Sequence, residues 1–383
     1  MTDIPFHVPM LGEQEIEAVA NALRDGWLTT GPLSLKFEEE FAAYVGARHA
    51  VTVASGTAAL HLALRVAGVR EGDEVITTPY TFVAVSEAIL YLHARPVFVD
   101  IDPRTLNIAP DAVARAVTPK TKAILPVHMA GYPCEMESLR STAEQHGLTL
   151  VEDAAHALPS DYDGRRIGSI STLTAFSFYA TKNLTTGEGG MITTNDPALA
   201  ERIKVLRLHG ISGDAWKRYT KGGRWYYEVV ENGYKYNLGD VQSAIGLVQL
   251  KKLDQMYGIR RRHDQLYREA LADCPVILPP AEDEKRRSAL HLFIIRLDSQ
   301  RTSWSREAFI EALQEERIFP SVHFIPVHLH PYYQAMGYRR SMYPEAERAY
   351  DQAISLPFYP AMPDSSVERL LDTVRRLLLR EPP

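Results

Sequence analysis

The chain has 383 residues, 42 basic and 48 acidic, which gives a formal net charge of −6 with 45% hydrophobic residues. This composition is typical of a globular protein, and its mild acidity argues against a nucleic-acid-binding protein, which would carry a basic stripe. No apolar run approaches the roughly 20 residues that span a bilayer, and two cysteines are too few for a disulfide framework. The first residues lack the charged and apolar segments of a secretion signal, so we expect a cytoplasmic protein without membrane contact.

Helical and strand-like segments alternate through the first half of the chain. Apolar spacing predicts helices over 13–24, 34–45, 56–67, 83–92, 110–117 and 135–146. Short apolar runs predict strands at 50–54, 74–78, 96–99, 123–127, 148–151, 173–178 and 191–193. Buried strands alternating with helices predict an α/β fold, with a mostly parallel central sheet sandwiched by helices.

The second half follows a different pattern. Residues 210–237 are rich in Gly, Tyr and Trp without clear periodicity, which is typical of a functional or packed loop. A long helix is predicted from about Asp240, followed by a strand near 292–297 and helices near 304–315 and 364–380. We therefore expect two domains: a large α/β domain over 1–255 and a smaller α+β domain over 256–383.

A turn of small residues, Ser55-Gly56-Thr57, lies between a predicted strand and a predicted helix. The free N–H groups and positive dipole end of a helix start suit a phosphate, and the two hydroxyls add donors. An ordinary N-cap also accounts for these residues, because Ser and Thr are common at helix starts. This motif alone does not decide between phosphate binding and an ordinary N-cap.

Two acids, Glu152 and Asp153, follow the strand predicted at 148–151. Open α/β sheets bind ligands at the carboxyl ends of their strands, so an acid here suits a ribose hydroxyl, a metal or a protonated ring nitrogen. The structural alternatives are that Asp153 caps the next helix and that His156 is a core histidine.

One lysine, Lys182, lies in a polar turn after the strand predicted at 173–178. Ser177 lies five positions before it, and the glycine-rich segment 187–190 after it allows backbone to pass close to a ligand. A lysine amine in a partly dry pocket can lose its proton and attack a carbonyl to form a Schiff base. Taken alone, a lysine would be interpreted as a solvated surface group.

Together, the three motifs provide a phosphate cradle, an acid for a ring nitrogen and a Schiff-base lysine. These parts are what a protein needs to hold pyridoxal phosphate, whose protonated ring stabilises the carbanion of an amino acid that has lost its α-proton. The order and joint presence of the motifs favour this cofactor.

At these residues the chain resembles the sugar aminotransferases of the DegT/StrS family, which are fold type I pyridoxal-phosphate enzymes. The resemblance is most specific over 176–190, around Lys182, and it extends from the segment 26–32 to His323. It implies a fold type I architecture and a homodimer with shared active sites.

The resemblance also implies roles for individual residues. Lys182 matches the lysine that forms the Schiff base and shuttles the proton, and Asp153 matches the acid that pairs with the ring nitrogen. His156 matches the residue beside the cofactor's phenolic oxygen, and Phe82 matches the aromatic residue that stacks on the ring. Phosphate binding is expected from Ser55, Gly56, Thr57 and Ser177, and from Asn237 across the dimer.

The segment 233–237, Gly-Tyr-Lys-Tyr-Asn, matches a family loop that reaches the neighbouring subunit's site. Many members read Gly-Tyr-Asn-Tyr-Arg, and the variant with Lys235 and Asn237 resembles enzymes acting on UDP-linked 4-keto sugars. We therefore expect a UDP-linked rather than a dTDP-linked sugar, with Lys235 as one contact. Further candidate sugar contacts are His323, Thr29 and Thr30, although the two threonines also suit an ordinary helix-entry turn.

A catalytic lysine favours amino transfer, because related proteins with histidine in that position perform dehydration. The implied reaction moves the amino group of L-glutamate to a keto group, at C4, of a nucleotide-linked sugar. Amination at C3, an amino-cyclitol substrate and a non-catalytic regulatory or binding role are the alternatives. Three histidines lie within 323–330, but no carboxylate or cysteine joins them at ligand spacing, so we expect no metal.

Overall fold

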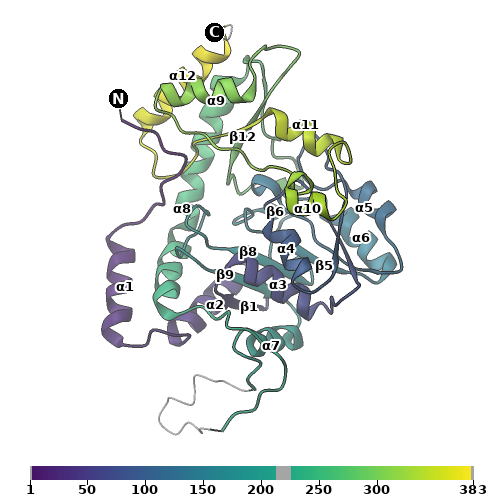
Figure 1. Ribbon diagram of the computed structural model, residues 1–383. Helices are drawn as coiled ribbons and strands as arrows, with labels where there is room; N and C mark the ends of the chain where they lie inside the picture. The colour runs from purple at the N-terminus through teal and green to yellow at the C-terminus, as the bar shows by residue number, and fades with distance from the viewer. Residues whose placement is uncertain (1, 213–225, 381–383) are drawn as a thin grey trace.

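The computed structural model describes residues 2–212 and 226–380 (Figure 1). Its centre is a seven-stranded sheet with the order β1-β9-β8-β5-β4-β2-β3. The strands are β1 (His49–Val53), β2 (Glu74–Thr77), β3 (Arg95–Phe98), β4 (Thr121–Ile124), β5 (Thr149–Asp153), β8 (Leu173–Ser177) and β9 (Gly190–Thr194). Only β9 runs antiparallel to its neighbours in this sheet, so the predicted mostly parallel sheet is confirmed.

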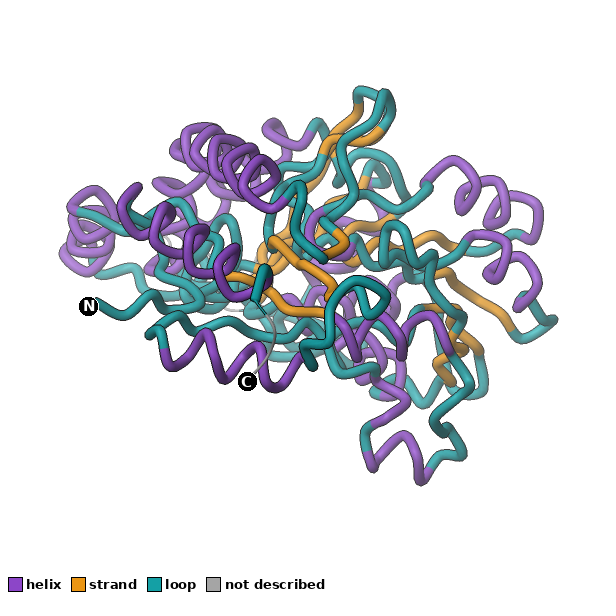
Figure 2. Tube along the Cα trace, turned by 90° about the horizontal axis from the view of Figure 1, so that it is seen from above, coloured by secondary structure: helices purple, strands orange, loops and turns teal. Residues whose placement is uncertain are grey.

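Successive residues of the strands enter two different cores, because side chains alternate between the faces of a sheet. Leu150 belongs to the core on one face, and Val151 belongs to the core on the other. The first face is covered by α2 (Pro32–Val45), α5 (Pro110–Ala116), α6 (Met136–His146) and α8 (Asp240–Leu271). The second is covered by α3 (Gly56–Val66), α4 (Ala84–Leu90) and α7 (Pro197–Leu206), and Figure 2 shows helices surrounding the central strands.

A smaller α+β region packs at the far end of α8, on the side where both ends of the chain lie (Figure 1). Its sheet has the order β10-β12-β13, with strands β10 (Val276–Ile277), β12 (Phe293–Leu297) and β13 (Ala353–Leu356). Its helices are α9 (Arg306–Glu315), α10 (Pro331–Ala335), α11 (Pro344–Gln352) and α12 (Asp364–Leu378). The strand and helices expected in this part of the chain are present.

The two-domain division with a boundary at 255/256 stays a proposal, which the distribution of buried side chains supports. Met256 belongs to the core on the α2 side of the large sheet, whereas Tyr257 belongs to the core of the smaller region. Both lie in α8, which passes through both regions, and Ile4 from the start of the chain joins the second core. A third sheet of short strands, β11 (Arg286–Arg287), β6 (Asp161–Tyr162) and β7 (Arg165–Arg166), also joins the two parts.

The turn before α2 is tied to the start of α8. The Asp240 carboxylate accepts hydrogen bonds from the backbone N–H groups of Gly31 at 2.8 Å and Ser34 at 2.9 Å, so it caps α2 although it lies more than 200 residues away. A Cβ on Gly31 would lie 2.1 Å from Nε1 of Trp27, so only glycine fits here. These contacts fix the turn that carries Thr29 and Thr30.

Among the residues that the structure describes, the remaining elements are α1 (Glu13–Asp25) and two short 3-10 helices, η1 (Met129–Gly131) and η3 (Val327–Leu329). Within 2–212 and 226–380, no helix is long and apolar enough to cross a membrane. Part of the aromatic-rich segment 210–237, residues 213–225 with Trp216 and Trp225, lies outside the described residues.

Candidate active site

A cavity of about 470 Å³ lies at the carboxyl ends of the parallel strands, where open α/β sheets bind their ligands. Residues from the start of the chain, including His7, and from the smaller region, including His291 and Phe358, complete its wall. Nine of the residues predicted from the sequence line it: Ser55, Gly56, Thr57, Phe82, Asp153, His156, Ser177, Lys182 and His323. The structure therefore brings together residues that the chain separates by more than 250 positions.

The Ser55-Gly56-Thr57 turn is both a helix cap and an open donor site. Ser55 is the N-cap of α3, and its Oγ accepts a hydrogen bond from the N–H of Ala58 at 3.1 Å. The first N–H groups of a helix have no partner within it, so those of Gly56 and Thr57 are available to an anion in the cavity. A Cβ on Gly56 would lie 2.8 Å from Cβ of Ser177, so glycine allows α3 to begin directly against β8.

Glu152 and Asp153 lie on opposite faces of β5, although the sequence presented both as candidate acids. Glu152 is bound inside the core, with Oε2 at 2.8 Å from Nε2 of His128 and Oε1 accepting from the hydroxyl of Thr174 at 3.0 Å. Asp153 lines the cavity, and its Oδ1 accepts a hydrogen bond from the N–H of Ala155 at 2.9 Å. Asp153 is therefore the acid that faces a ligand.

Burial perturbs both charged groups at the centre of the cavity. It lowers the pKa of Lys182 to about 8, and the nearby Asp153 carboxylate limits that shift. It also raises the pKa of Asp153 above its ordinary value, against the opposing effects of the Ala155 N–H and the Lys182 charge. An amine with this pKa has an appreciable unprotonated fraction near neutral pH, which a nucleophile and base requires.

Four histidines line the same cavity: His7, His156, His291 and His323. Burial holds the pKa of His156 well below its ordinary value and lowers those of His7 and His323 to about 4, with Lys182 adding to the effect at His156 and His323. These rings are therefore neutral over the physiological range. Nδ1 of His156 is buried and has no hydrogen-bond partner among the described residues, so it is free to bind a ligand.

Sequence reasoning missed His7 and His291. His7 precedes the first helix, and His291 precedes β12, and neither stands in a motif with other polar residues. A single histidine beside an apolar strand carries no spacing signal, so only the tertiary structure shows that it reaches the cavity.

Aromatic rings form the mouth of the cavity. Phe82 is 58% exposed, and its ring centroid lies 5.9 Å from that of Phe324. The Phe324 ring lies in turn 5.9 Å from His156, with 20° between the two planes. Phe82 thus lies at the entrance, where a flat ligand can be covered by an aromatic ring.

Four predicted residues do not line the cavity of their own chain: Thr29, Thr30, Lys235 and Asn237. Asn237 donates through Nδ2 to Oγ1 of Thr30 at 2.9 Å, so these two side chains form a polar cluster of their own. Thr29 lies beside them, with its Oγ1 at 3.4 Å from the same nitrogen, and Lys235 is exposed on the same segment as Asn237.

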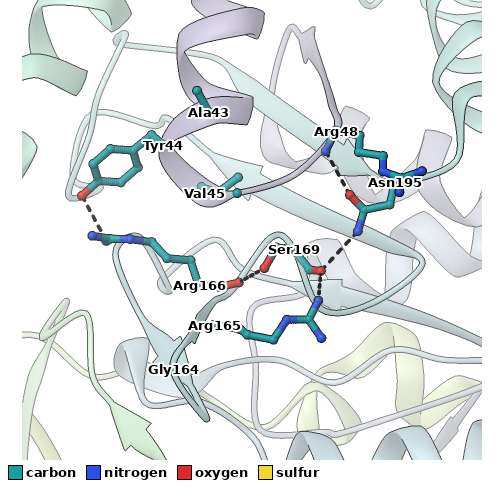
Figure 3. A pocket seen from close by; sticks show the side chains of 10 residues that line it. Ala43, Tyr44, Val45, Arg48, Gly164, Arg165, Arg166, Ser169 and Asn195 are labelled. Carbon is teal, nitrogen blue, oxygen red and sulfur yellow. Dashed lines mark hydrogen bonds between the residues drawn. The ribbon is translucent and has the colours of Figure 1, made fainter.

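A second hollow, of about 690 Å³, lies at the opposite edge of the large sheet (Figure 3). It is lined by Arg48, Arg165 and Arg166, and by none of the predicted site residues. Arg165 donates to the carbonyl of Ser169, and Arg166 donates to the hydroxyl of Tyr44 at 3.2 Å. Two of the three guanidinium groups are thus engaged by the surrounding surface, and the predicted site residues line the smaller cavity instead.

Comparison with known proteins agrees with this geometry. The sequence profile of the DegT/DnrJ/EryC1/StrS aminotransferase family matches residues 9–375. The spore coat polysaccharide biosynthesis protein SpsC of Bacillus subtilis is 48% identical over 377 residues, which cover 98% of this chain and 97% of that protein. An uncharacterised protein of Methanocaldococcus jannaschii, MJ1066, is 47% identical over 375 residues, which cover 98% of this chain and 97% of that protein.

Solved structures show the same fold. The putative sugar aminotransferase Spr1654 from Streptococcus pneumoniae, in its PMP form, superposes with a TM-score of 0.91 at 32% identity and 99% coverage of both chains. PseC of Helicobacter pylori, an aminotransferase involved in the biosynthesis of pseudoaminic acid, superposes with a TM-score of 0.90 at 30% identity, covering 98% of this chain and 99% of that one.

Proposed function

From the premise that the chain belongs to the DegT/DnrJ/EryC1/StrS aminotransferase family, we propose that it transfers the amino group of L-glutamate to the C4 keto group of a UDP-linked sugar. At the coarser level, the protein is a pyridoxal-phosphate-dependent sugar aminotransferase of fold type I. The observation that carries the proposal is Lys182, whose amine shares one cavity with Asp153 and the start of α3, and whose pKa burial lowers to about 8.

The residues of the cavity fit pyridoxal phosphate. The free N–H groups at the start of α3 suit its phosphate, and the close approach that Gly56 allows places Ser177 beside them. Asp153 supplies a carboxylate for the ring nitrogen, and the unpartnered Nδ1 of His156 is available to a polar ring substituent. When bound, the cofactor supplies an electron-withdrawing ring that stabilises the carbanion left by loss of an α-proton.

Each residue then has a task that follows from its position. Lys182 would hold the cofactor through its amine and, once an amino donor has freed that amine, would serve as the base that takes the α-proton of the donor. Asp153 keeps a proton on the ring nitrogen, since an ionised carboxylate makes a strong hydrogen bond to a cation. Phe82 covers the ring at the entrance. In the second half of the reaction Lys182 would deliver a proton to the sugar carbon that carried the keto group.

The identity of the sugar is inferred from the segment 233–237. Its Lys235 and Asn237 resemble those of enzymes acting on UDP-linked 4-keto sugars. His323 lines the cavity, and its Nδ1 lies 2.9 Å from the hydroxyl of Ser355. That contact fixes the ring, so Nε2 is left for a sugar hydroxyl.

An absorbance experiment tests the two half-reactions separately. Adding L-glutamate to the purified holoenzyme should bleach the visible band of the bound cofactor, and UDP-4-keto sugars should restore it faster than dTDP-4-keto or 3-keto sugars do. If only a 3-keto sugar or a keto-cyclitol restored the visible band, that compound would be the acceptor and the UDP-4-keto sugar would be excluded. If glutamate left the band unchanged and another amino acid bleached it, that amino acid would be the donor in place of glutamate.

We further propose a homodimer in which the 233–237 segment serves the partner subunit's cavity. The support is that Thr29, Thr30, Lys235 and Asn237 do not line the cavity of their own chain. Asn237 would then donate to the cofactor phosphate across the dimer.

Mixed dimers test this arrangement. A Lys182→Ala chain and an Asn237→Asp chain should each form inactive or weak homodimers, the second because a carboxylate would repel the phosphate. In a mixed dimer with shared sites, one site would contain an intact Lys182 and an intact Asn237, so activity should return on mixing. If mixing gave no more activity than the Asn237→Asp homodimer has, Lys182 and Asn237 would belong to the site of the same chain.

A further inference from the structure

His291 is held in the cavity wall by the residue that follows the catalytic lysine. Asn183 is buried, and its Nδ2 donates to the carbonyl oxygens of Leu158 at 2.9 Å and Ala289 at 2.8 Å. Its Oδ1 lies 3.0 Å from Nδ1 of His291. The amide of Asn183 therefore uses both of its N–H groups on the main chain and has only its oxygen left for the imidazole.

This pattern determines the tautomer of His291. Rotating the Asn183 amide by 180° would set its oxygen against two carbonyl oxygens, so Oδ1 must face the ring. An amide oxygen only accepts, so Nδ1 of His291 must carry the hydrogen and Nε2 must carry the lone pair. Burial holds the pKa of His291 well below its ordinary value. The charged and titratable groups that face the ring lower this pKa further, and they are His156, Lys182, Arg260 and His323. The ring is therefore neutral.

The backbone around His291 is held as firmly as its side chain. Arg260, fully buried in α8, donates through Nη1 to the carbonyl oxygens of Leu290 at 3.0 Å, His291 at 3.2 Å and Phe358 at 3.1 Å. Leu290 has a φ of 51°, a left-handed conformation that is unfavourable for a residue with a side chain. Strain that the surroundings maintain in this way is found mainly at functional sites.

The held ring lies among the reacting groups. His291 lines the cavity with Lys182, and its ring centroid lies 4.4 Å from that of His156, with 35° between the planes. An imidazole N–H directed at a free amine would occupy the lone pair that the amine needs for attack. A lone pair on Nε2 leaves the amine free and can accept one of its hydrogens.

We propose that Asn183 is a positioning residue that locks His291 as its Nδ1–H tautomer, so that Nε2 presents a hydrogen-bond acceptor to the amine groups handled in the cavity. The proposal depends on the aminotransferase chemistry and not on which sugar is the acceptor. It adds two residues to the site, and neither stood in a sequence motif that pointed to this role.

The tautomer can be observed directly by NMR of the holoenzyme labelled with ¹⁵N-histidine. The His291 signal is the one absent from the His291→Gln variant, and we expect it to report a protonated Nδ1 and an unprotonated Nε2 at neutral pH. In Asn183→Ala the same signal should show loss of the Nδ1–H form. A wild-type His291 with its hydrogen on Nε2 would overturn the proposal, whatever the enzyme's activity.

Kinetics supply the second test. One buried hydrogen bond contributes about 1 kcal/mol, so Asn183→Ala should lower kcat by about fivefold and leave KM for glutamate little changed. Glutamine at position 291 offers an N–H to Asn183 and an oxygen to the cavity, so His291→Gln should retain much more activity than His291→Leu. Equal activities of these two variants would overturn the proposal.

A matched control separates this role from a general loss of stability. Asn195 accepts from the N–H of Arg48 at 2.9 Å and donates to the carbonyl of Ser169 at 3.2 Å, at the edge of the sheet remote from the cavity. Asn195→Ala should lower the thermal midpoint without changing kcat. If Asn183→Ala does not fold, the proposal is still tested by the wild-type NMR spectrum and by the activities of His291→Gln and His291→Leu.

Discussion

Replacing Lys182 with alanine should abolish amino transfer. The amine is buried beside Asp153, and burial lowers its pKa to about 8, so it can act as nucleophile and as base near neutral pH. Under the roles we propose, alanine would remove the covalent attachment of the cofactor as well as the proton transfer, and general acid–base catalysis alone contributes about 10²–10⁴-fold. We therefore expect a loss of more than about 10⁴-fold in the glutamate half-reaction, measured as bleaching of the visible cofactor band.

The variant should remain folded, because burying an amine costs free energy that alanine does not incur. Circular dichroism should show an unchanged or higher thermal midpoint. Lys251→Ala, which removes an exposed lysine from α8, is the matched control and should retain full activity. Turnover by the Lys182→Ala variant that matches this control would contradict the role of Lys182.

The same pKa gives the sign of a pH dependence. Lys182 attacks as the free amine, so the rate at which cofactor-free protein captures pyridoxal phosphate should rise with pH and level off above about pH 8. A lysine with its ordinary pKa of 10.5 would instead give a rate that still rises above pH 8 and levels off only above about pH 10.5. Stopped-flow absorbance distinguishes the two profiles.

The parts of the fold and site that the sequence predicted are those with a local signal. Each strand of the large sheet is a short apolar run, and the Ser55-Gly56-Thr57 turn, Asp153 and Lys182 all follow such runs. Parallel strands end at one edge, so a motif at the end of each strand is enough to predict that the motifs meet.

The parts that could not be predicted depend on contacts between distant segments. His7 and His291 reach the cavity from the start of the chain and from the smaller region, and no periodicity encodes that approach. The cap on α2 comes from Asp240, across more than 200 residues. The short strands β6, β7 and β11 have two residues each, too few for an alternating pattern to identify.

Asp153→Asn should leave the cofactor attached and slow amino transfer. Asparagine keeps the shape of the side chain but loses the charge that we propose holds a proton on the ring nitrogen. Breaking one side of a buried ionic pair costs about 3–5 kcal/mol, which corresponds to a loss of about 10²–10⁴-fold in kcat. The visible band should persist, because Lys182 is intact, while glutamate bleaches it slowly. The carboxylate also raises the pKa of Lys182, so that pKa should fall below about 8 in this variant.

Glu152 provides the control for this prediction, because it is the adjacent acid on the opposite face of the same strand. A glutamine there can accept from His128 and donate to Thr174, the two partners of the native carboxylate. Glu152→Gln should therefore cost stability, by about 1–3 kcal/mol for a weakened buried network, and leave the glutamate half-reaction close to wild type. If instead Glu152→Gln slowed the glutamate half-reaction and Asp153→Asn did not, the acid that serves the ring nitrogen would be the one buried in the core. That result would refute the assignment of the two roles to opposite faces of β5.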